Sequence, residues 1–208
     1  MSARNTHAAK AARRAARASA DERAIRTELA DYGAAILTGT VRLSGTSDET
    51  TTHASAALWV SEHGRLFAPG GARPAGMARG EPLECFANAQ REGREHDLGY
   101  AEGFAGPSEA GRWILHAWNT DGAGRVIDPT WDDDPLARCQ YFGVPVAAGD
   151  LPPGEKAGSS VIGELLVGKL LDWDRVTGRV RLIDGTDPIA RAILERGEPL
   201  LFSGPAAR

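Results

Sequence analysis

The chain of 208 residues is long enough for one sizeable hydrophobic core, and its 42% hydrophobic and 25% charged residues are typical of a soluble globular protein. No apolar run approaches the length of a membrane span, and no hydrophobic signal-peptide core follows the N-terminus, so we expect a cytoplasmic location. Two cysteines cannot build a disulfide framework, which fits a reducing compartment.

The net charge of −4 is unevenly distributed, because residues 1–30 carry +4 and the remaining 178 residues carry −8. Residues 1–20 are mainly Ala, Arg and small polar residues without an apolar face, so they predict a basic flexible arm, partly helical by propensity. Contact of this arm with nucleic acid is an alternative, but no aromatic residue or motif supports it. Residues 21–208 are predicted to form a single domain. The composition of the arm is also that of GC-rich bacterial coding sequences.

The segment before the first cysteine predicts a helix, a strand, a hairpin and a loop, in that order. Apolar residues recur with helical spacing after Asp21: Ile25, Leu29, Tyr32 and Ile36. Apolar and polar residues alternate over residues 36–43, which predicts a strand, and residues 57–60 and 65–68 resemble the two arms of a hairpin. Residues 69–80 are rich in Gly, Pro and Ala, which indicates a surface loop that is either one wall of a substrate cleft or a plain connector.

Cys85 lies where the next helix should begin. Pro82 suits a first helical position, and the apolar spacing predicts a helix from near Glu81 to about Arg94. The thiol then lies in the first turn, where unpaired N–H groups and the helix dipole favour a thiolate and can stabilise an oxyanion. Asn88, one turn later on the same face, is a candidate oxyanion donor or a contact that supports the site.

The following segment predicts an antiparallel hairpin. Residues 113–119 (WILHAWN) and 125–131 (RVIDPTW) are rich in β-formers, and turn residues lie between them. A three-residue loop would place His116 directly opposite Asp128, with Cβ atoms about 5 Å apart on one face of the sheet. That distance suits an imidazole–carboxylate hydrogen bond. Trp118 shares this face, where it can line the site or shield the pair from water.

Cys85, His116 and Asp128 together supply a thiol nucleophile, a general base and the group that orients the base. Zinc ligation by these residues with Cys139 is an alternative, but the paired short spacings of zinc knuckles are absent. We therefore expect neither a metal nor a cofactor. A second alternative is a non-catalytic binding or structural module, in which the thiol is a small core residue and Asp128 caps a turn before Pro129.

The same residues carry a family resemblance. Cys85, a GYxxGF strand at 99–104, HAW at 116–118 and DPTW at 128–131 follow one another within about fifty residues. This order resembles the core of the transglutaminase-like enzymes within the papain-like thiol superfamily. No Asn or Gln occurs between residues 64 and 84, so the resemblance assigns no side-chain oxyanion donor before the nucleophile.

The resemblance implies an α+β fold in which the helix bearing the Cys packs on an antiparallel sheet bearing the His and the Asp. The catalytic core would be about residues 80–146, with a triad of Cys85, His116 and Asp128. It implies acyl transfer through a thioester on a peptide, protein or small amide. Hydrolysis and transfer both remain open, since the superfamily includes proteases, amidases and acyltransferases.

The C-terminal third carries no chemical motif. Residues 141–146 predict a strand, residues 161–171 a helix, residues 180–183 a short strand and residues 187–196 a final helix. No internal repeat is apparent in the chain.

Overall fold

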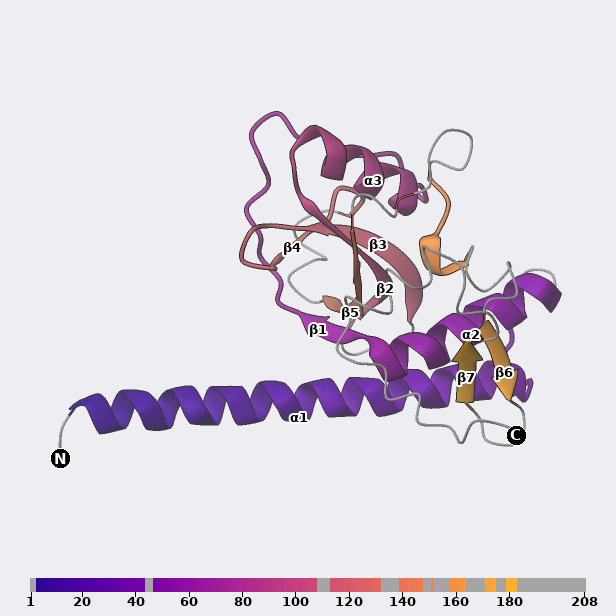
Figure 1. The fold of residues 1–208 in the computed structure, drawn as a ribbon, viewed down its shortest axis with the longest axis horizontal. Helices are drawn as coiled ribbons and strands as arrows, with labels where there is room; N and C mark the ends of the chain where they lie inside the picture. The colour runs from indigo at the N-terminus through magenta and orange to yellow at the C-terminus, as the bar shows by residue number, and fades with distance from the viewer. Residues whose placement is uncertain are drawn as a thin grey trace.

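The computed structural model is an α+β protein in which helices pack on a curled, antiparallel five-stranded sheet (Figure 1). The described residues are 3–43, 47–107, 113–131, 139–147, 151, 158–163, 171–174 and 179–182. The helices are α1 (Ala3–Leu37), α2 (Ser47–His63) and α3 (Cys85–Glu95). The strands of the main sheet are β1 (Arg65–Phe67), β2 (Gly99–Pro107), β3 (Ile114–Thr120), β4 (Val126–Ile127) and β5 (Cys139–Val146).

The main sheet has the strand order β1-β5-β2-β3-β4, and every neighbouring pair is antiparallel. Its two edges come together, because the backbone N–H of Val126 in β4 donates to the carbonyl of Ala68, directly after β1, at 2.8 Å. This contact gives the sheet an inner face and an outer face, and alternate residues of each strand point to one or the other.

The outer face packs against the helices and forms the larger core. The buried apolar residues there come from α1, α2, α3, β2, β3 and β5 and from segments outside these elements; the largest include Leu29, Trp59, Phe104 and Phe142 on the named elements and Ile162 outside them. The inner face holds a smaller aromatic cluster, which consists of Phe67, Ala101, Ala105, Trp118, Val126 and Tyr141. The inner face is the one that carries His116, since His116 and Trp118 are two residues apart on β3.

The N-terminal arm is helical rather than irregular. It forms the first half of α1, which Figure 1 shows extending well beyond the rest of the protein. Residues 16–20 are exposed, and the first buried side chain from residue 16 onward is Ile25. The packed part of α1 therefore coincides with the predicted amphipathic helix.

The predicted strand at residues 36–43 is wrong. Helix α1 ends at Leu37, and Gly39, two residues later, has a φ of +75° in the left-handed region. The N–H of Gly39 donates to the Ile36 carbonyl, and that of Val41 donates to the Ala35 carbonyl. Glycine at this position allows the turn that closes the helix.

The predicted hairpin at residues 57–68 is also wrong in its first arm, because residues 57–60 belong to α2. This helix lies between α1 and the sheet, and Ala54, Ala57 and Trp59 are all buried in it. A helix that is covered on both sides has apolar residues all around it. Its sequence is then a continuous apolar run, and periodicity cannot show whether such a run is a buried helix or a buried strand. Only β1 of the predicted hairpin is present.

The C-terminal third is described in part. Strand β7 (Arg179–Leu182) confirms the predicted short strand to within one residue, and it pairs with β6 (Leu171–Asp174). The predicted helix at 161–171 is wrong at its end, since Leu171 lies in β6; residues 161–163 are helical, and residues 164–170 lie outside the described residues. The predicted final helix at 187–196 also lies outside them. No helix among the described residues combines the length and the apolar character needed to cross a bilayer.

Candidate active site

Cys85 is the first residue of α3, four residues later than the predicted start near Glu81. Leu83, with φ +69°, turns the chain just before the helix, and Glu84 occupies the N-cap without a side-chain cap. The N–H groups of the first helical turn have no carbonyl partner within the helix. The thiol thus lies at the positive end of the helix, beside donors that can stabilise an oxyanion.

His116 and Asp128 form the predicted contact. His116 Nε2 lies 2.6 Å from Asp128 Oδ2, and both residues are 1% exposed. The hairpin that brings them together has a different register from the predicted one, because Asn119 pairs with Ile127 and Thr120 pairs with Val126.

The register prediction was wrong by two residues, and the contact survives for a geometric reason. The loop has five residues rather than three, which moves Asp128 from the position opposite His116 to a diagonal one. A shift of two residues keeps a side chain on the same face, whereas a shift of one would have moved it to the other. Strand β4 ends at Ile127, and the chain then turns so that the Asp128 carboxylate reaches the imidazole.

The Asp128 carboxylate is held by three groups besides His116. Its Oδ1 accepts hydrogen bonds from the N–H of Thr130 at 2.8 Å and the N–H of Trp131 at 3.1 Å. Its Oδ2 also accepts a hydrogen bond from the Tyr141 hydroxyl at 2.9 Å. Burial raises the pKa of Asp128, but the hydrogen bond and charge of His116, with the two backbone donors, outweigh burial and hold the pKa below its usual value.

His116 connects Asp128 to the thiol. Burial lowers the pKa of His116, but hydrogen bonds and charge interactions with Asp128 and Cys85 outweigh burial and raise the pKa to about 9. The bond to Asp128 uses Nε2, which leaves Nδ1 as the other ring nitrogen, and Cys85 is near enough to raise the pKa of His116. The imidazole is therefore protonated at neutral pH and lies between a carboxylate and a thiol.

Aromatic rings enclose the imidazole. Trp131 stacks on His116 with ring centroids 4.1 Å apart and an interplanar angle of 18°. Trp118, the predicted shielding residue, shares the face of His116 but lies farther away, at 6.5 Å, and packs against Phe67 and Tyr141 in the inner core. Trp131 therefore lies closer to the imidazole than Trp118 does.

Tyr141 is a site residue that the sequence did not indicate. It lies on β5, two strands away from His116 in the sheet, and its hydroxyl reaches Asp128 across the inner face. Burial raises the pKa of Tyr141, and the Asp128 charge and hydrogen bond raise it further, so the hydroxyl remains a donor at all ordinary pH values. Its only signal in the sequence is its place as a tyrosine in a strand, which is shared by many core tyrosines.

The predicted loop at residues 69–80 runs along β4 toward α3. The N–H of Gly71 donates to the Val126 carbonyl at 2.8 Å, and the Arg73 side chain donates to the Asp128 carbonyl at 3.0 Å. Near the end of the loop, the N–H of Gly80 donates to the Pro129 carbonyl at 2.8 Å. A Cβ at Gly80 would collide with the Asn88 side chain, so only glycine fits there. These hydrogen bonds hold the loop beside the candidate site.

Asn88 supports the site from behind. Its side-chain nitrogen donates to the Glu81 carbonyl at 2.7 Å and to the Thr130 hydroxyl at 3.1 Å, which uses both amide hydrogens. Of its two predicted roles, this geometry favours the supporting contact, because an oxyanion would have to displace one of these acceptors. Asn88 joins α3 to the turn that presents Asp128.

A second polar network holds the middle of α3. The Tyr100 hydroxyl donates to Glu102 at 2.6 Å and accepts from the Gln90 amide at 3.3 Å. Glu102, fully buried on β2, also accepts hydrogen bonds from the Ser160 hydroxyl and from the N–H groups of Val161 and Ile162. Burial raises the pKa of Glu102, while these hydrogen bonds act to lower it.

The zinc hypothesis concerned Cys85, His116, Asp128 and Cys139. Among the described residues, the group of His, Cys, Asp and Glu donors close enough to share one ion lies elsewhere, at the C-terminal end of α3. Both cysteines are free thiols, Cys85 buried and Cys139 half-buried.

Comparison of the chain with protein-family models, with curated proteins and with solved structures gives no match. The chemistry of this site is therefore argued from its own geometry.

Proposed function

We propose that this protein is a thiol-dependent acyl-transfer enzyme, with Cys85 as nucleophile, His116 as acid and base, and Asp128 as the group that orients His116. The observation that carries the proposal is the buried His116–Asp128 hydrogen bond of 2.6 Å, with Cys85 close enough to His116 to raise the pKa of the imidazole. A helix N-terminus beside an antiparallel sheet also supports the resemblance to the transglutaminase-like and papain-like core.

Each group has a defined task in the proposed reaction. The Cys85 thiolate attacks the carbonyl carbon of an amide or ester, and the N–H groups at the start of α3 stabilise the oxyanion. The protonated His116 donates its Nδ1 proton to the leaving amine or alcohol, which leaves a thioester on Cys85. His116 then accepts a proton from water or from an acceptor amine, and attack of that molecule on the thioester releases the product.

The substrate class we propose is a peptide, a protein or a small amide. Water as acceptor makes the enzyme a hydrolase, and an amine makes it an acyltransferase. A free thiol at the reacting centre fits a reducing compartment such as the cytoplasm. The alternative of a non-catalytic module gives no reason for a buried imidazolium between a carboxylate and a thiol, since burial of charge is costly.

The first test is the alkylation of the two cysteines by iodoacetamide as a function of pH, followed by mass spectrometry. We expect Cys85 to react at neutral pH at least about tenfold faster than Cys139, which serves as an internal control. Burial and the Asp128 charge raise the pKa of Cys139, so its reaction should begin only in alkaline solution. The variant His116→Ala should slow Cys85 to the rate of an ordinary thiol.

The second test is exposure of the protein to a panel of acyl esters and amides. A mass increase on Cys85 equal to the acyl group would identify the thioester. Equal and alkaline-only alkylation of the two cysteines, together with no acyl adduct on Cys85, would contradict the proposal and favour the non-catalytic alternative.

A further inference from the structure

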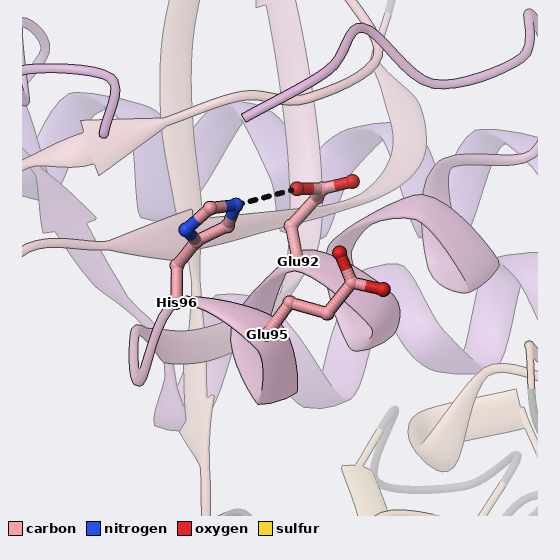
Figure 2. Close-up of side chains that lie close together, drawn as sticks. All are labelled: Glu92, Glu95 and His96. Carbon is pink, nitrogen blue, oxygen red and sulfur yellow. Dashed lines mark ion pairs between the residues drawn. The ribbon is translucent and has the colours of Figure 1, made fainter. Parts of the chain in front are cut away.

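Three potential metal ligands converge in the last turn of α3, at the opposite end of the helix from Cys85. Glu92, Glu95 and His96 are spaced i, i+3 and i+4, which places them on one helix face (Figure 2). One donor atom from each lies within 4.8 Å of the other two. The cluster lies 7 to 11 residues after Cys85 along the helix, a rise of about 10–16 Å at 1.5 Å per residue, so it is a different site.

Glu92 is the unusual member of the cluster. It is 1% exposed, and its Oε1 pairs with the Arg91 guanidinium at 2.9 Å. Its other oxygen, Oε2, is buried and accepts no hydrogen bond from the described residues. An unsatisfied carboxylate oxygen in such a position costs about 1–3 kcal/mol or more. The cluster therefore leaves one buried carboxylate oxygen without a hydrogen-bond donor.

The distance from this oxygen to His96 indicates what kind of group could bind it. Glu92 Oε2 faces His96 Nε2 at 3.4 Å, as the dashed line in Figure 2 shows, and the pair does not have the geometry of a hydrogen bond. Two ligands bound to one tetrahedral zinc ion, with bonds of about 2.0–2.1 Å, lie about 3.3 Å apart. The observed separation of the two atoms thus already matches that of two ligands on one ion.

We propose that Glu92, Glu95 and His96 bind a divalent transition-metal ion, with Zn²⁺ as the best fit. One imidazole and two carboxylates are ligands that zinc accepts, and a water molecule would complete a tetrahedral site. The ion gives Glu92 Oε2 a bonding partner and links the end of α3 to His96, the C-cap residue of the helix. This turn leads directly into β2, so bound metal stabilises the connection between the thiol-bearing helix and the sheet.

The test is a titration of the metal-free full-length protein with Zn²⁺ alone, measured by calorimetry. The variants are His96→Ala and Glu95→Gln at the proposed site, and Cys85→Ala at the thiol site, because thiols also bind zinc. Glu62→Gln is the matched control, since Glu62 and His63 form another Glu–His pair, 3.8 Å apart, that does not belong to the three-ligand cluster.

We expect one site in the wild type, in Cys85→Ala and in Glu62→Gln, with affinity at least about 100-fold weaker in His96→Ala and Glu95→Gln. Removal of a group that only supports a metal ligand already lowers metal affinity by about 10- to 100-fold, and removal of a ligand itself should lower it more. Zn²⁺ should also raise the melting temperature of the wild type and not that of His96→Ala. Co²⁺ bound at the site should give a spectrum without a thiolate charge-transfer band.

Three results would overturn the proposal. One is wild-type affinity and stoichiometry in both His96→Ala and Glu95→Gln, and another is loss of the site in Cys85→Ala, with a thiolate band in the Co²⁺ spectrum. Absence of binding by the wild type would also reject the site. None of these outcomes depends on the acyl-transfer proposal, which is tested by alkylation of Cys85.

Discussion

Asp128 holds the candidate site together, because its carboxylate accepts hydrogen bonds from four groups. Two backbone N–H groups bind Oδ1, while His116 and the Tyr141 hydroxyl share Oδ2. The imidazole is the only one of the four that reaches the thiol. The orientation of the other three therefore decides where the His116 ring lies relative to Cys85.

The substitution Asp128→Asn tests this arrangement. The asparagine oxygen can keep the two backbone donors, so we expect the fold to remain, but its NH₂ group would then face His116 Nε2. A donor there forces the His116 proton onto Nδ1, and the imidazole loses its ability to accept a proton from the thiol side. Turnover of any substrate found for Cys85 should fall by about 1,000-fold or more. Unchanged turnover, with a native circular dichroism spectrum, would remove Asp128 from the mechanism.

The pH dependence of stability gives a second prediction. The pKa of His116 is raised from 6.5 to about 9, so its contribution to stability is fully present below pH 6.5 and is lost as the pH rises through 9. The shift corresponds to about 3 kcal/mol. Asp128 has a lowered pKa, so its contribution is present above its ordinary pKa of 3.8 and is lost as the pH falls below that value.

Urea unfolding of the wild type and of Asp128→Asn across this range measures the effect. The stability difference between the two proteins should be largest between about pH 4 and pH 6.5 and should shrink toward pH 9. A difference that stays constant from pH 5 to pH 9 would show that the ionised pair does not contribute.

Leu83 is an apolar residue that the fold leaves in solvent. It is 98% exposed, two residues before the thiol, and its positive φ costs about 1–2 kcal/mol for a non-glycine residue. Because strained residues cluster at functional sites, we expect Leu83 to contact the substrate. The substitution Leu83→Asn keeps a residue that tolerates this backbone and removes the apolar surface.

Steady-state kinetics check this expectation. If substrate covers Leu83, kcat/KM should fall by about 10- to 100-fold in Leu83→Asn, because burial of one leucine side chain contributes about 1.5–3 kcal/mol. The melting temperature should stay the same or rise. An unchanged kcat/KM would mean that Leu83 lies outside the substrate contact.

At the scale of elements, α3 must be held rigidly, since it carries the nucleophile. The Tyr100 hydroxyl links the helix, through Gln90, to Glu102 on β2 and so to residues 160–162. The substitution Tyr100→Phe removes this link without changing the size of the ring. We expect a loss of about 1.5–3 kcal/mol, because the lost hydrogen bond is to a buried carboxyl group.

Tyr32→Phe is the matched control for this loss. The Tyr32 hydroxyl contacts His53 at 3.4 Å in a half-buried position, so its removal should cost less than about 0.5 kcal/mol. Urea unfolding gives both values. The rate of Cys85 alkylation then shows whether the network also positions the thiol. Equal losses in the two variants would mean that the Tyr100 link is not important to the fold.

At the scale of the whole molecule, the first half of α1 lies outside the packed body. Residues 16–20 are exposed, Ile25 is buried, and Figure 1 shows the N-terminal part of the helix extending away from the rest of the protein. A truncated protein that begins at Ala20 should therefore keep its melting temperature and its Cys85 reactivity. Asp21 and Glu22 would then stand at the start of the helix, where acidic residues are favourable. A lower melting temperature or a change in Cys85 reactivity would mean that the arm packs on the body.

Local signals in the sequence predicted the residues of the candidate site and the elements that carry them. The apolar spacing predicted a helix with Cys85 in its first turn, although Pro82 lies before the helix and not at its first position, and turn residues between two β-rich runs predicted His116 and Asp128 on one hairpin. The alternation of side chains along a strand then fixed their common face, which is why an error of two residues in the register did not separate them.

Tertiary structure decided what depends on contacts between distant segments. The apolar run in α2 is a helix because α1 and the sheet cover it from both sides, and a local pattern cannot report such burial. Tyr141 reaches Asp128 only because β5 lies two strands from β3 in a curled sheet. Strand order and curvature arise from pairing between residues far apart in the chain, whose positions no short stretch of sequence specifies.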